Sequence, residues 1–85
     1  MEKNIKLVNE SGLHARPAGV LVNEAKKYES DIQIKYGDKT VNAKSIMNLL
    51  SLGLDKGSEI TIITNGSDEE EALNALSNLL ENELD

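Results

Sequence analysis

The sequence contains no cysteine, and His14 is the only histidine among its 85 residues. Without cysteine, the chain can form neither a disulfide scaffold nor a thiolate metal site. A single histidine is too few for an ordinary zinc site. No nucleotide-binding motif is present either. We therefore expect no bound metal and no cofactor.

Long apolar runs and clusters of basic residues are also missing. No segment approaches the length that a membrane span needs, and residues 1–4 precede an alternating stretch instead of the apolar core of a signal peptide. We expect a cytoplasmic protein without membrane insertion. The net charge is −6, from 15 acidic and 9 basic residues. Direct binding to nucleic acid needs clustered lysine and arginine, so we do not expect it.

The length of 85 residues predicts one domain over 1–85. A chain this short buries a modest fraction of its surface and has no volume to enclose a deep cleft. Any chemistry should therefore take place on the surface, with a partner protein supplying the rest of the site. This favours a protein that is not itself an enzyme. The acidic run at residues 68–71 is interpreted as a solvated helix face.

Alternation of apolar and polar residues predicts four strands. They cover residues 4–8, 32–36, 39–42 and 59–64. Gly37 and Asp38 supply the tight turn of a hairpin between the second and third strands.

Three- and four-residue spacing of apolar residues predicts three helices. The first begins near Pro17, which suits a first turn, and the second is short, with Ser45 as its N-cap. Ser67 and Glu70 form a capping box before the third. The apolar stripe of the first helix comprises Ala18, Leu21, Val22, Ala25 and Tyr28; that of the second comprises Ile46 and Leu49; that of the third comprises Ala72, Leu73, Leu76, Leu79, Leu80 and Leu84.

The resulting order, βαββαβα, favours an α+β open-faced sandwich. In it, a four-stranded antiparallel sheet is covered on one face by three helices. A split βαβ arrangement would place the last strand between the first two.

The most informative stretch is Gly12-Leu13-His14-Ala15-Arg16-Pro17-Ala18. It sets His14 just before a helix, where free N–H groups and the helix dipole attract anions, and Arg16 adds a guanidinium suited to phosphate oxygens. An imidazole, with a reference pKa of about 6.5, can act as a nucleophile toward a phosphoryl group. From these residues alone, a helix-capping histidine beside a solvated arginine, phosphate binding and phosphoryl transfer all stay open.

This stretch resembles the active-site motif of HPr, the histidine-containing phosphocarrier family of the bacterial phosphoenolpyruvate-dependent sugar phosphotransferase system. A second stretch, residues 44–53, resembles the family's regulatory serine segment. The resemblance implies that enzyme I, which draws on phosphoenolpyruvate, phosphorylates His14 on Nδ1. The group would then pass to the IIA domains of sugar permeases, with Arg16 binding the phosphate.

The same resemblance gives Ser45 a second role besides capping a helix. In the Gram-positive branch, the matching serine is phosphorylated by an HPr kinase/phosphorylase, and the phosphoserine form is a corepressor for a catabolite-control transcription regulator. Met47 and Leu50 are expected to form a small exposed apolar patch for docking partners. Two departures from many relatives, Gly19 and Asn48, bear on stability and partner affinity.

Three other functions stay open. One is a regulatory module that works through phosphorylated Ser45 and no longer carries phosphate on His14. Another is a paralogue in non-sugar phosphotransferase signalling. An autonomous enzyme is the weakest alternative, because the sequence places no second acid–base residue near His14.

Overall fold

The structure, a computed structural model, describes residues 1–8, 12–13 and 15–83. Within these residues the chain forms, in order, β1 (Glu2–Lys6), α1 (Ala15–Ala25), β2 (Asp31–Tyr36), β3 (Lys39–Asn42), α2 (Ile46–Leu50), β4 (Glu59–Asn65), α3 (Glu69–Asn78) and a π-helical turn, η1 (Leu79–Glu83). The four strands form one antiparallel sheet in the order β1-β4-β2-β3. The last strand therefore lies between the first two, as predicted.

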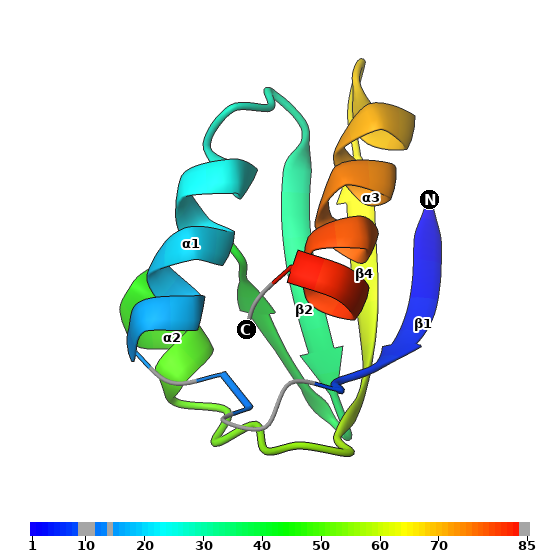
Figure 1. Ribbon diagram of the computed structural model, residues 1–85. Coiled ribbons are helices and arrows are strands. Elements are labelled where there is room, and N and C mark those ends of the chain that lie inside the picture. The colour runs from blue at the N-terminus through cyan, green and yellow to red at the C-terminus, as the bar shows by residue number, and fades with distance from the viewer. Residues whose placement is uncertain (9–11, 14, 84–85) are drawn as a thin grey trace.

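One face of the sheet carries the core, and α1 and α3 lie side by side over that face (Figure 1). Ile34 on β2 is paired with Ile62 on β4, and Ile5 on β1 with Ile60 on β4. All four side chains are buried, while the residues that alternate with them along β2 are exposed. Alternation along β2 thus places apolar side chains under the helices and polar ones on the open face.

The predicted bounds of the first strand were wrong, whereas Pro17 lies in the first turn of the first helix, as predicted. β1 ends at Lys6 instead of residue 8, and Leu7, although buried, pairs with the turn before β4. Its N–H donates to the Ser58 carbonyl at 2.9 Å, and its carbonyl accepts from the Gly57 N–H at 2.8 Å. The first helix begins at Ala15, which still leaves Pro17 in the first turn, where its missing N–H removes no helical hydrogen bond.

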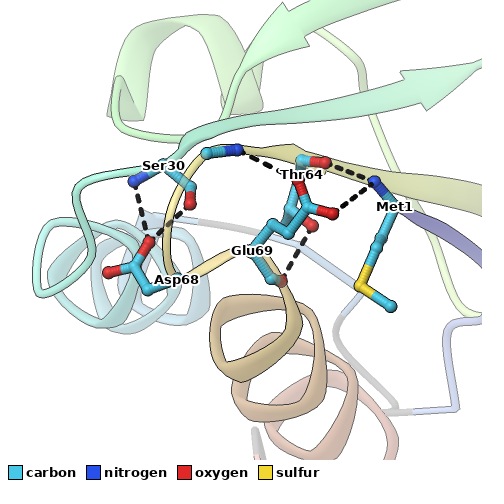
Figure 2. Close-up of polar contacts among 6 residues, drawn as sticks. Met1, Ser30, Thr64, Asp68 and Glu69 are labelled. Atoms are coloured by element: carbon cyan, nitrogen blue, oxygen red, sulfur yellow. Dashed lines mark hydrogen bonds and ion pairs between the residues drawn. The ribbon is translucent and has the colours of Figure 1, made fainter.

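The predicted capping box of Ser67 and Glu70 is also wrong, because α3 begins one residue later, with Asp68 at the N-cap position. The Asp68 carboxylate accepts hydrogen bonds from the N–H groups of Glu29 and Ser30, each at 3.0 Å, and from the Ser30 hydroxyl. Figure 2 shows this carboxylate turned toward Ser30, away from its own helix. Glu29 and Ser30 thus supply Asp68 with three hydrogen-bond donors. The sequence around Asp68 does not predict these contacts.

Asp68 and its neighbours form a paired polar cluster at the start of α3. Glu69 accepts from the Gly66 N–H at 3.1 Å, and the Thr64 hydroxyl donates to the Glu69 carbonyl at 2.9 Å. The Met1 amino group donates to the Thr64 carbonyl at 2.6 Å (Figure 2). Hydrogen bonds to the carboxylate, first of all from the Ser30 hydroxyl, lower the pKa of Asp68 below its usual value.

The apolar stripes of α1 and α3 were predicted correctly up to their ends. Tyr28 lies beyond the end of α1 and is half-buried against the core. Leu79 and Leu80 are buried, although they fall in η1. Leu84 lies outside the described residues.

Candidate functional site

The segment before α1 is held close to the turn that follows α2. The Leu13 N–H donates to the Leu54 carbonyl at 3.0 Å, and the Leu13 side chain is buried. Gly12 has a positive φ of 63°, and a Cβ on it would lie 2.4 Å from the Leu54 carbonyl oxygen. A side chain at position 12 would therefore be obstructed by the Leu54 carbonyl. His14 itself lies outside the described residues.

Arg16 is in the first turn of α1, and it is exposed. Among the described residues it makes no ion pair, and the first turn of α1 carries no acidic residue. The first N–H groups of a helix have no partner within the helix. The start of α1 therefore combines positive helix-end character with a guanidinium that no described carboxylate neutralises, which is an arrangement that favours anions.

Ser45 is the N-cap of α2, as predicted. Its backbone is extended, with φ −124° and ψ 117°, and its hydroxyl accepts a hydrogen bond from the Asn48 N–H at 3.3 Å. Ser45 is half-buried, and the hydrogen bond of its hydroxyl is exposed. Ser51 closes the helix, and Gly53 follows with φ 62°.

The side chains of α2 point mostly outward. Met47 is 77% exposed and Leu50 36%, which agrees with the predicted exposed patch. Ile46, expected in the core together with Leu49, is 42% exposed, so that part of the prediction was wrong. The core at this place is filled by buried side chains before, within and after the helix, namely Ala43, Leu49 and Leu52. We call Ile46, Met47 and Leu50 the α2 apolar surface.

Val20 on α1 was not singled out from the sequence, and it is 43% exposed. Helix α1 packs against α2. The sequence could have predicted the exposure of Val20, because Val20 is an apolar residue outside the buried stripe of its helix. Helical spacing therefore predicts that it faces away from the core.

Three further features of the described residues concern metal ligands, long apolar helices and a surface hollow. Within the described residues, no three histidine, cysteine or acidic side chains come together as metal ligands. None of the described helices combines the length and apolar character needed to cross the bilayer. A hollow of about 390 Å³ on the open face of the sheet contains none of the predicted site residues; its lining comprises Asp31, Ile32, Gln33, Asn42, Lys44, Ile63 and Asn65.

Comparison with known proteins identifies a matching family and several similar structures. Residues 1–82 match the family described as the PTS HPr component phosphorylation site. HPr-C-His from Thermoanaerobacter tengcongensis is 44% identical, with a TM-score of 0.95 over 99% of this chain and 94% of that one. The phosphocarrier protein HPr from Bacillus anthracis is 49% identical, with a TM-score of 0.91 over 94% and 95%. The catabolite repression containing protein Crh from Bacillus subtilis is 43% identical, with a TM-score of 0.80 over 93% and 91%.

Proposed function

Because the chain belongs to the HPr family of phosphocarrier proteins, we propose that His14 is the residue that carries its phosphoryl group. The donor is enzyme I, charged from phosphoenolpyruvate, and the acceptors are the IIA domains of sugar permeases. A ring nitrogen of His14 attacks phosphorus, so a nitrogen–phosphorus bond forms while the bond to the donor breaks. The same exchange in the opposite sense delivers the group to the acceptor. Residues 1–85 act as one domain in the cytoplasm, as a co-substrate of transferases.

The arrangement at the start of α1 is the main support for this proposal. His14 directly precedes the helix, and Arg16 stands exposed in its first turn without an ion pair to any described residue. The guanidinium and the early N–H groups of the helix supply donors for phosphoryl oxygens. Charge-assisted hydrogen bonds of this kind are about twice as strong as neutral ones. Arg16 is therefore the phosphate-binding residue.

Met47 and Leu50 are the residues on which partner proteins dock. Exposed apolar side chains gathered on one short helix mark protein interaction surfaces. Met47 is the most exposed of the large apolar side chains described, and methionine adapts its shape to different partners. Both properties suit a carrier that meets a donor and several acceptors in turn.

The test of this function is the variant His14→Ala. We expect it to accept no phosphoryl group from enzyme I charged with phosphoenolpyruvate, while its unfolding midpoint in urea stays that of the wild type. Radiolabel transfer and circular dichroism measure the two properties on the same preparation. Normal labelling of His14→Ala would contradict the assignment.

A second role, regulation through Ser45, is favoured by the position of its hydroxyl and by the likeness to Crh. Phosphorylation by an HPr kinase/phosphorylase would add about −1.5 to −2 charge beside the α2 apolar surface. The negative charge is favourable at a helix N-terminus. At the surface where enzyme I docks, however, it weakens binding through charge repulsion and through the free-energy cost of desolvating the phosphate. The phosphorylated form would bind a catabolite-control transcription regulator. As an alternative, this regulatory binding is the chief role of the chain.

Ser45→Asp and Ser45→Ala separate regulation from simple capping. Both variants lose the hydroxyl, but only Ser45→Asp gains charge, and aspartate is itself a good N-cap. We expect Ser45→Asp to slow phosphorylation of His14 without lowering the melting temperature. Ser45→Ala should keep the rate and lose about 1 kcal/mol of stability. Equal slowing in both variants would remove the support for a regulatory Ser45.

A further inference from the structure

Helix α2 has little of its own to hold it in place. It spans five residues, Ile46–Leu50, and Leu49 is its only buried side chain. Isolated helices of this length are not stable in water, so packing and flanking contacts decide where α2 lies. The contacts of the residues on either side of α2 therefore decide how the α2 apolar surface is presented to a partner.

One such contact is made by Lys44, two residues before the helix. The Lys44 ammonium donates a hydrogen bond to the backbone carbonyl of Tyr28 at 2.8 Å, in a partly buried position. This contact joins the segment that leads into α2 to the segment that follows α1. The donor is charged, which makes the bond stronger than a neutral one, and positive charge near the C-terminal end of α1 is itself favourable.

The acceptor of this bond is held in place. The Tyr28 N–H donates to the Ala25 carbonyl, the last residue of α1, at 3.2 Å. The Tyr28 hydroxyl donates to the Glu24 carboxylate at 3.2 Å. Burial and the neighbouring Glu24 raise the pKa of Tyr28 above its usual value. Tyr28 is thus anchored to α1 through both its backbone and its side chain.

The backbone around Lys44 is held as well. The Lys44 N–H donates to the Asn42 side-chain carbonyl at 2.9 Å, and the Ala43 N–H donates to the Ile32 carbonyl at 2.9 Å. The next residue, Ser45, caps α2. A series of hydrogen bonds therefore links the end of α1, through Tyr28 and Lys44, to the first turn of α2.

We propose that Lys44 is a positioning residue, which fixes α2 against α1 and thereby sets the affinity of partners for the α2 apolar surface, without contacting the phosphoryl group. This inference rests on the proposed function in naming that surface as the place where enzyme I docks. It assigns Lys44 a part in partner binding and none in the chemical step.

The test compares Lys44→Met, which keeps the aliphatic length but loses the ammonium, with Lys26→Met as the matched control. Lys26 also lies near the end of α1, it is exposed, and its side chain has no bond to a described residue. For phosphorylation by enzyme I, we expect Lys44→Met to raise KM roughly threefold to tenfold with kcat unchanged. Lys26→Met should leave both constants unchanged, and Lys44→Arg, which keeps a charged donor, should restore KM.

Hydrogen exchange of the α2 amides supplies a readout that needs no partner. Lys44→Met should speed exchange within α2 more than within the sheet, whereas Lys26→Met should match the wild type. The proposal would be overturned if Lys44→Met and Lys26→Met had the same KM and the same α2 exchange. It would also be overturned if Lys44→Met lowered kcat alone. A wild-type protein that accepts no phosphate would refute the proposed function instead, and the exchange comparison would still decide whether Lys44 holds α2.

Discussion

Where α3 begins, polar groups are paired with one another, whereas the Arg16 side chain, in the first turn of α1, is exposed. Asp68 accepts one hydrogen bond from Glu29 and two from Ser30, and Figure 2 shows the two from Ser30. Arg16, by contrast, makes no ion pair with a described residue, and Met47 on the neighbouring α2 is 77% exposed. Figure 1 shows α1 and α3 starting at opposite ends of the molecule.

The difference indicates that the two regions have different roles. Polar groups that are hydrogen-bonded within the chain hold distant segments together and are not available to bind a partner. Groups left unsatisfied cost little at an exposed surface and gain their partners when another protein docks. Substitutions at the two ends should therefore separate stability from phosphoryl transfer.

Gly12→Ala breaks this separation and should have the largest effect. Gly12 lies next to the proposed site, but its positive φ and its approach to the Leu54 carbonyl leave no room for a Cβ. We expect the free energy of unfolding to fall by about 2–4 kcal/mol, from backbone strain and overpacking together. Urea denaturation measures it, and an unchanged midpoint would show that the segment before α1 adapts at no cost.

Arg16→Ala should slow phosphoryl transfer and leave the stability of the fold unchanged. Loss of one charge-assisted contact should cost about 1.5–3 kcal/mol in the transition state, which is roughly one to two decades in rate. Stability should not change, because no described residue pairs with Arg16. Single-turnover transfer from enzyme I is the measurement. Unchanged kinetics would return Arg16 to an ordinary surface charge.

Asp68→Asn should have the opposite signature, with stability lowered and transfer unchanged. An amide can accept from Ser30, but its NH₂ group then faces the Glu29 N–H, which loses its acceptor. The melting temperature at pH 7 should fall, while the rate of phosphorylation stays that of the wild type. A slower rate with the melting temperature unchanged would reverse the assignment of the two ends.

The pH dependence of stability tests the same carboxylate. The pKa of Asp68 is lower in the folded protein than in the unfolded chain, so the carboxylate stabilises the fold above the unfolded value of about 3.9. This contribution disappears as the pH falls through the lower, folded pKa. Between pH 5 and strongly acidic solution, the wild type should therefore lose more stability than Asp68→Asn. Parallel curves for the two proteins would contradict the role of Asp68.

Gly19→Ala should give the smallest effect, a gain in stability of about 0.5–1 kcal/mol, since alanine is the better helix former. Gly19 lies inside α1, and a Cβ there meets no atom within 4 Å. It is the matched control for Gly12→Ala, because both variants add one methyl group near the start of α1. A loss of stability at Gly19 would mean that α1 needs a glycine for a reason beyond helix packing.

The sequence pattern predicted the faces of the elements better than their ends. Residues 4–8 were expected as the first strand, and Glu2–Lys6 forms it. Both place Ile5 in the core, because side chains alternate along a strand wherever the strand begins or ends. The capping rule chose Ser67, whereas Asp68 is positioned by donors 38 and 39 residues away. No local pattern carries information on contacts at that separation.

The candidate site shows the same limit. The N-cap at Ser45 and the exposure of Met47 follow from neighbours in the sequence. The exposure of Ile46 does not, because it depends on how Ala43 and Leu52 already fill the core at that place. The bond from Lys44 to Tyr28 joins two turns that only the complete fold brings together.

Phosphoryl transfer through His14 is tested most simply by charging the wild-type protein with phosphoenolpyruvate and enzyme I and locating the phosphate. We expect one phosphoryl group on His14, which mild acid removes because the linkage is a phosphoramidate, and which a IIA domain discharges. Mass spectrometry at neutral pH gives the position, and acid treatment gives the linkage. No labelling, or an acid-stable phosphate on a hydroxyl residue alone, would contradict transfer through His14.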